Sequence, residues 1–235
     1  MDKNKLTGTI IFSVAIVLCG IMLPVAVKNF REYDRTVTVK GLCEKEVKAD
    51  KAIWPITYRL GSDSLTDLTA NMDKNTATIV DFLKKGGIKD EEISISVPTI
   101  SDKLASEWNS DRKVRYIGKC CLTVCTDNVD AVIELNSRVT ELLKKGIVLG
   151  SGDYGDNCSA TYSFEGLNGI KPEMIHDATA NARLAAEQFA SDSGSRIGKI
   201  KTATQGTFSI ESRDSNTPQI KKVRVVTYLT YYLNN

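Results

Sequence analysis

Apolar and polar positions alternate over several short stretches of the chain, which is the period-two pattern of half-buried β-strands. The first stretch, residues 36–47, places Val37, Val39, Cys43 and Val47 on one face. We expect residues 53–60 to form its hairpin partner. Further strands are predicted over residues 93–100, 114–126, 160–164, 200–211 and 221–233.

Three other stretches follow the three- and four-residue spacing of amphipathic helices. They are residues 64–85, residues 129–145 and a segment from Pro172 to Gly194. The third helix carries an apolar stripe of mostly small residues, which lets a helix approach a sheet closely. Its members are Met174, Ala178, Ala182, Ala185 and Phe189.

The order of these elements predicts an α+β fold, with a mainly antiparallel sheet and three helices packed on it. A doubly wound parallel fold is the second choice. It requires strict alternation of strands and helices, whereas this chain places two strands in succession at several points.

The last predicted strand is apolar on both faces. Val223, Val225, Leu229, Tyr231 and Leu233 point one way, and Val226, Tyr228 and Tyr232 point the other. A second apolar face indicates a contact with another subunit or a partner. We therefore take Val226, Tyr228 and Tyr232 as candidate contact residues, together with Trp108 in the polar turn over residues 106–112.

The start of the chain has a different pattern, because residues 6–27 contain no charged side chain. As a helix this stretch would measure about 33 Å, enough to cross a bilayer core. A cleaved signal peptide is disfavoured because Pro24 stands where small residues are expected, and lipid attachment at Cys19 is disfavoured by Leu18. We expect residues 1–35 to form a cytoplasmic tail, a transmembrane anchor and a stalk, and residues 36–235 to form an exported domain.

Charge and composition exclude two classes of function, nucleic-acid binding and histidine-rich metal chemistry. The chain has 31 Lys and Arg, 29 Asp and Glu, and one His. The two signs are interspersed, so no basic surface for nucleic acid is expected. A single imidazole also excludes histidine-rich zinc sites.

The short motifs in the sequence do not indicate a nucleotide-binding, phosphate-binding or catalytic site. Residues 150–155 match the dinucleotide fingerprint G-x-G-x-x-G, but the next residues are predicted as turn and strand, whereas the fingerprint needs a helix N-terminus there. Residues 194–199 have one residue too few for a phosphate-binding loop. His176 and the pair Glu91 and Glu92 fit solvated surface positions. We expect no enzyme, cofactor or metal site.

The cysteines suggest one possible function, that of a thiol-based redox or stress protein. Outside the anchor there are five, and Cys120 fits a buried position. An odd number leaves at least one thiol free or bridged between chains. Cys121 and Cys125 lie about 13 Å apart on one strand, too far for a direct disulfide. The redox candidates are Cys43, Cys121, Cys125 and Cys158.

Several motifs resemble those of the SIMPL domain family over residues 36–233. The first is Val37-x-Val39-x-Gly41-x-Cys43-Glu44 followed by Asp50-x-Ala52, with Cys43 in place of the second glycine of the family. Gly87-Ile88 to Ile93-Ser94 resembles the Gly-Ile, acidic turn and strand of the family. The alanine helix over 178–190, continuing through Gly194 to Ile197-Gly198, is the most specific part.

The resemblance implies a non-enzymatic α+β domain of the bacterial envelope. Relatives are linked to stress tolerance, and some form ring-like or channel-like oligomers. We therefore expect a single-pass protein of the inner membrane, with its C-terminal domain in the periplasm or outside the cell. It would act by self-association as a homo-oligomer or by binding a protein partner.

Overall fold

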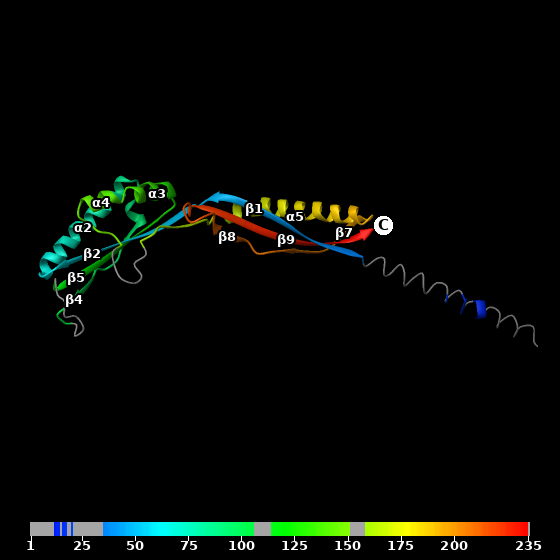
Figure 1. The fold of residues 1–235 in the computed structure, drawn as a ribbon, viewed down its shortest axis with the longest axis horizontal. Helices are drawn as coiled ribbons and strands as arrows, with labels where there is room; N and C mark the ends of the chain where they lie inside the picture. The colour runs from blue at the N-terminus through cyan, green and yellow to red at the C-terminus, as the bar shows by residue number, and fades with distance from the viewer. Residues whose placement is uncertain are drawn as a thin grey trace, which may run out of the picture. The chain divides into compact units, whose positions relative to one another are not determined.

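The computed structural model describes residues 35–105, 114–150 and 158–234, together with residues 12–14, 16, 17 and 20. The chain divides into two compact units. Unit 1 consists of residues 1–45, 170–209 and 223–235, and unit 2 consists of residues 46–169 and 210–222. Each unit therefore combines segments that are distant in the sequence (Figure 1).

Unit 2 is built on a five-stranded sheet with the order β3-β5-β2-β6, in which β4 also pairs with β5. Its centre is the antiparallel pair of β2 (Lys51–Ser62) and β5 (Tyr116–Thr126), which are paired from Ala52 with Thr126 to Ser62 with Tyr116. The shorter strands are β3 (Ile93–Ile95), β4 (Thr99–Asp102) and β6 (Thr161–Ser163).

One face of this sheet is covered by α2 (Leu65–Lys85), α3 (Val129–Ser137) and α4 (Thr140–Lys144), and a short 3-10 turn, η1, spans Asp90–Glu92. The core between them is made of large side chains. Those less than 2% exposed include Trp54, Ile56, Tyr58, Leu68, Ile79, Leu83, Leu122, Leu135 and Leu142. The Tyr58 hydroxyl donates to the Met72 carbonyl oxygen at 2.8 Å, and burial raises its pKa to about 12. The strand pair and α2 are thus joined by a buried polar contact as well as by packing.

Unit 1 contains most of a four-stranded sheet with the order β1-β9-β7, in which β8 also pairs with β9. The strands are β1 (Thr36–Lys48), β7 (Arg196–Gln205), β8 (Ser209–Ser212) and β9 (Ile220–Asn234). The first and last strands are neighbours, and the Leu233 amide donates to the Arg35 carbonyl oxygen at 2.8 Å. Helix α5 (Leu167–Asp192) runs along one face of these strands (Figure 1).

The packing of α5 on this sheet depends on small residues. Its buried positions recur at every fourth residue: Met174, Ala178, Ala182, Ala186 and Ala190. A Cβ atom added to Gly41 of β1 would lie 1.8 Å from the Ala178 carbonyl oxygen and 2.5 Å from the Ala182 nitrogen. The absence of a side chain at Gly41 therefore lets the helix backbone lie directly against the strand.

Some of the predictions about the fold are confirmed and others are wrong. The class is α+β with antiparallel pairing and three main helices, but there are two sheets, and β1 and β2 are not a hairpin because they belong to different sheets. The predicted stripe fails at its end: Phe189 is 61% exposed and Ala186 replaces Ala185 as the buried residue. A phenyl ring does not fit where the helix lies so close to the sheet.

The N-terminal prediction falls mostly outside the described residues. Of the expected anchor over residues 6–27, only positions 12–14, 16, 17 and 20 are described, and they are helical. Within the part of the chain that the structure describes, no helix has the length and hydropathy needed to cross a bilayer. The anchor, and the boundary after residue 35, stay predictions.

Candidate functional site

The candidate contact residues of the last strand lie on the sheet face of unit 1 that α5 does not cover. Along β9 the odd-numbered residues from Lys221 to Tyr231 are buried, and the even-numbered ones are half-buried or exposed. Tyr228 is 41% exposed, and Val226 and Tyr232 are half-buried. The sequence analysis therefore assigned these three side chains to the correct side of the strand.

Neighbouring strands complete this surface, which we call the outer face of unit 1. Thr204 of β7 pairs with Tyr228, and Thr202 pairs with Thr230. From β1, the Thr38 hydroxyl lies 3.0 Å from the Thr230 hydroxyl. Three strands thus place threonine side chains beside the tyrosine rings of this face.

Two lysines on the outer face lie over the tyrosine rings. The Lys40 ammonium nitrogen is 5.2 Å from the centre of the Tyr228 ring, and that of Lys201 is 5.3 Å from the centre of the Tyr232 ring. Both distances fit a cation–π contact. Sequence reasoning missed these lysines, although Lys40 alternates with Val39 in the first strand and so had to point away from the core.

Unit 1 also exposes apolar side chains on the free side of α5. Leu184 is 63% exposed and Phe189 is 61% exposed. The sequence analysis placed Phe189 in the core, so this second apolar area was not foreseen. It lies on the opposite side of unit 1 from the outer face, because α5 separates it from the sheet.

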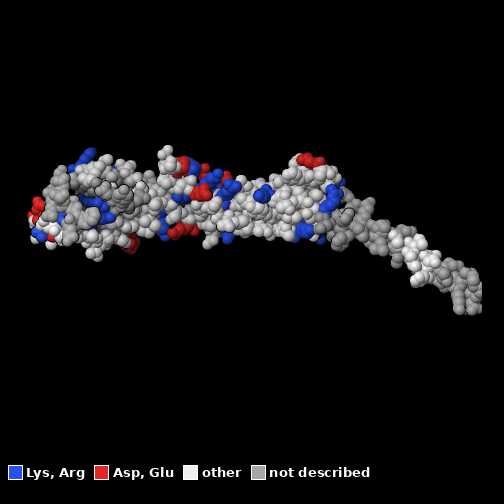
Figure 2. All heavy atoms as spheres, turned by 60° about the horizontal axis from the view of Figure 1, so that its bottom comes forward, with Lys and Arg blue, Asp and Glu red and all other residues white. Residues whose placement is uncertain are grey.

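The other predicted contact residue, Trp108, lies outside the described residues. Charges on the face drawn in Figure 2 are mixed, with Lys and Arg next to Asp and Glu along the described chain. Many of these charges form exposed ion pairs, such as Lys45 with Glu173 at 2.7 Å and Arg183 with Glu187 at 2.9 Å in unit 1. Such pairs contribute little to stability and leave little net charge locally.

The cysteines do not form a common site. All five described cysteines are free: Cys43, Cys120, Cys121, Cys125 and Cys158. The pKa of the Cys43 thiol is raised, first by burial and then by the nearby Asp177 and Glu173 carboxylates, which disfavours the reactive thiolate. Cys125 is exposed and Cys121 is half-buried on the same strand. Cys158 lies in unit 2 and accepts a hydrogen bond from the Thr57 amide at 3.4 Å.

Metal and nucleotide chemistry have little support in the described residues. Among them, no group of three or more His, Cys, Asp and Glu side chains is placed to hold a metal ion. His176 is exposed on α5. In the glycine motif, Gly150 has a φ of +66°, and residues 151–155 lie outside the described residues.

Comparison with known proteins identifies the family. No curated protein matches the chain. A family profile matches residues 37–227, and it is described as SIMPL, a protein of unknown function (DUF541). The match includes Gly41 of β1, the alanine stripe of α5 and, from the outer face of unit 1, Lys40 and Val226, and it ends before Tyr228. It also agrees with the resemblance of the valine, glycine and alanine motifs. This chain therefore belongs to the SIMPL family.

Proposed function

We propose that this protein is a non-enzymatic component of the bacterial envelope that acts by self-association through the outer face of unit 1. An N-terminal anchor in the inner membrane would hold the folded part on the periplasmic or outer side. The observation that carries the proposal is the composition of the outer face, where Tyr228, Tyr232, Val226 and Leu42 are exposed or half-buried on one sheet surface. Tyrosine is enriched in protein interfaces because it combines apolar area with a polar end.

Self-association is favoured over a different partner because the outer face is self-complementary. It carries both tyrosine rings and the lysines that lie over them. In a two-fold homo-oligomer the same surface of both copies is in contact, so the tyrosine rings of one copy would face a surface that carries lysines. A chemically different partner would not need both groups on the same face.

The thiol hypothesis has less support. The thiol of Cys43 has a raised pKa, and Cys120 is fully buried. Redox sensors need low-pKa, accessible thiols with a resolving cysteine nearby. Cys125 meets only the requirement for exposure.

Light scattering of the full-length, detergent-solubilised chain tests the proposal. We expect an oligomer whose mass falls to that of one chain in the double variant Tyr228→Thr and Tyr232→Thr. Threonine keeps the strand propensity while removing the rings. The matched control is Leu184→Ser and Phe189→Ser on α5, which should leave the mass unchanged. A monomeric parent chain, or an oligomer that survives the tyrosine substitutions, would contradict the proposal.

A further inference from the structure

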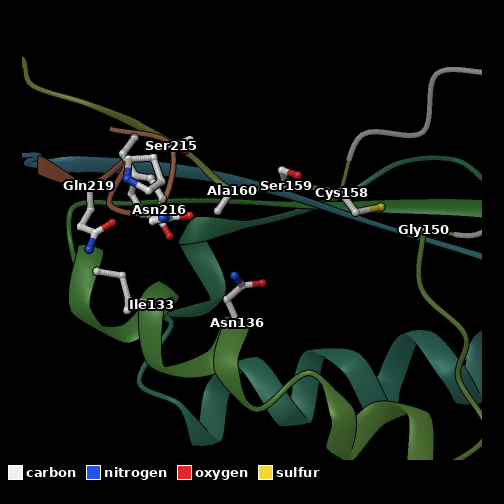
Figure 3. A pocket seen from close by; sticks show the side chains of 11 residues that line it. Ile133, Asn136, Gly150, Cys158, Ser159, Ala160, Ser215, Asn216 and Gln219 are labelled. Atoms are coloured by element: carbon white, nitrogen blue, oxygen red, sulfur yellow. The ribbon is translucent and has the colours of Figure 1, made fainter. Parts of the chain in front are cut away.

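Unit 2 contains an open cavity of about 760 Å³ that none of the predicted contact residues line. Four parts of the chain line it: the end of α3, Gly150, the chain from Cys158 into β6, and the turn between β8 and β9 (Figure 3). The lining residues are Ile133, Asn136, Gly150, Cys158, Ser159, Ala160, Tyr162, Ser215, Asn216, Pro218 and Gln219.

The lining is polar, and none of the described residues that form it is Lys, Arg, Asp or Glu. Carboxamides come from two different walls, with Asn136 on α3 and Asn216 and Gln219 on the turn, and Figure 3 shows these three on opposite sides of the same space. In the part of the chain that the structure describes, none of the three makes a side-chain hydrogen bond. Each therefore has an N–H donor and a carbonyl acceptor available to a ligand.

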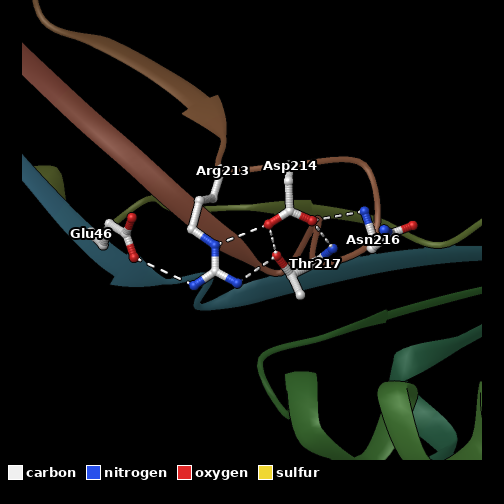
Figure 4. A network of polar contacts seen from close by, with 5 residues as sticks. All are labelled: Glu46, Arg213, Asp214, Asn216 and Thr217. Atoms are coloured by element: carbon white, nitrogen blue, oxygen red, sulfur yellow. Dashed lines mark hydrogen bonds and ion pairs between the residues drawn. The ribbon is translucent and has the colours of Figure 1, made fainter.

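The turn that carries two of these carboxamides is held in place by a separate polar network (Figure 4). The Asp214 carboxylate accepts hydrogen bonds from the backbone amides of Asn216 and Thr217, at 2.8 and 2.7 Å. It also accepts from the Thr217 hydroxyl and from the Arg213 guanidinium, the latter at 2.9 Å. These hydrogen bonds, first that of the Thr217 hydroxyl and then that of Arg213, hold the pKa of the Asp214 carboxyl well below its usual range. The turn is thus fixed by the side chains of Asp214, Arg213 and Thr217, none of which lines the cavity.

The other end of the turn and the wall opposite it are also anchored through the backbone. The Ala49 amide donates to the Gln219 carbonyl oxygen at 2.8 Å. The Trp54 indole donates to the Cys158 carbonyl oxygen at 3.1 Å, next to the strand β6. The backbone of the cavity is therefore preorganised, while its carboxamide side chains are left for a ligand. Preorganisation of this kind reduces the entropy that binding must overcome.

We propose that this cavity binds a neutral saccharide. A carboxamide donates and accepts at once, which matches the vicinal hydroxyls of a sugar, and the described lining residues supply no charged side chain to pair with a phosphate or a carboxylate. Ile133, Ala160 and the half-buried Tyr162 supply apolar surface for a sugar ring face or an acetamido methyl. The volume is within the range of about 300–1,000 Å³ usual for small-molecule sites.

Saturation-transfer NMR and titration calorimetry test this with the full-length chain in a detergent that has no sugar headgroup. The probes are cellobiose, the disaccharide and tetrasaccharide of N-acetylglucosamine, and a neutral tetra-alanine peptide. We expect transfer to at least one saccharide and none to the peptide.

Variants locate the binding. We expect Gln219→Ala on the turn and Asn136→Ala on α3 each to weaken saccharide binding about tenfold, the effect of losing one well-formed hydrogen bond. The matched control is Asn71→Ala, which removes an exposed carboxamide from α2 and should leave affinity unchanged. Absence of transfer to every saccharide, binding of the peptide alone, or equal affinity in all three variants would overturn the proposal. None of these outcomes depends on the oligomeric state.

Discussion

The two sheets of this protein hold their helices by different means. In unit 2, bulky side chains such as Trp54, Ile56 and Leu122 fill the space between the sheet and α2 and α3. In unit 1, the buried cluster consists mainly of Ala182, Ala186, Val39, Leu229 and Tyr231, and a glycine takes the place of a side chain at the closest approach. Unit 2 is stabilised by buried apolar volume, and unit 1 by the close contact of two backbones.

This difference has an energetic consequence. Burial of apolar area is roughly proportional to the surface removed from water, so large side chains contribute more than alanines. Unit 1 therefore has less buried apolar volume for its own folding, while it also displays apolar side chains on the outer face and on α5. A surface contact between copies would add the burial that its interior lacks.

A substitution that creates a cavity in unit 2 is expected to have the largest effect on stability, and it tests the difference between the two units most directly. Leu122 is fully buried in β5 opposite Ile56. We expect Leu122→Ala to lower the free energy of unfolding by about 3 kcal/mol, because the lost apolar contact leaves a cavity. Urea unfolding gives the magnitude, and amide hydrogen exchange separates the effect on β5 from that on α5.

The control for this cavity is Leu122→Met, which preserves volume and should cost less than about 1.5 kcal/mol. If α5 lost as much protection as β5 in Leu122→Ala, the two units would unfold as one. The distinction between them would then have no thermodynamic meaning.

A methyl group at Gly41 tests the close contact of unit 1. Because its Cβ would collide with the backbone of α5, we expect Gly41→Ala to destabilise the protein by about 2 kcal/mol. Gly169→Ala is the matched control, since a Cβ there has no heavy atom within 4 Å. That helical substitution should stabilise by about 0.5 kcal/mol. Thermal unfolding of both variants measures the contrast, and equal stability of the two would refute the role assigned to Gly41.

The smallest effect on the free energy of unfolding is expected from substitutions at Thr227 of β9. They test a polar group buried in the interior of unit 1. Its hydroxyl oxygen is buried and has no hydrogen-bond partner among the described residues. Thr227→Val keeps the shape and removes the unsatisfied group, so we expect a gain of about 1 kcal/mol in urea unfolding. Thr227→Ser keeps the hydroxyl and should give no gain. A loss of stability in the valine variant would show that the hydroxyl has a partner.

Local patterns in the sequence predicted most elements, because they depend on side-chain period and capping. Ser64 was expected to begin the first helix, and its hydroxyl accepts from the Asp67 amide at 3.3 Å. Two predicted strands are each broken in two, after Ile95 and after Gln205. Pro98 lies in the first break, and proline cannot donate to a sheet ladder. Gly206 lies in the second, where its amide donates to the Val226 carbonyl oxygen at 2.8 Å.

Long-range pairing could not be read from such patterns. β1 has the alternation of a strand, but nothing in its residues specifies β9 as its neighbour and not β2. Val226, Tyr228 and Tyr232 could be assigned to the outward side of β9 because parity along one strand is a local property. The cavity was not found, because Asn136 and Gln219 are ordinary polar residues in sequence and meet only through the tertiary fold.

The pairing of β1 with β9 has a consequence for biogenesis. During synthesis β1 emerges early, and its neighbour, the 15 residues of Ile220–Asn234, emerges only after every other described element. The strands of the five-stranded sheet can meet long before that. A nascent chain therefore carries β1 without its partner strand until Ile220–Asn234 has been made, and an unpaired strand edge of this kind is prone to join other chains.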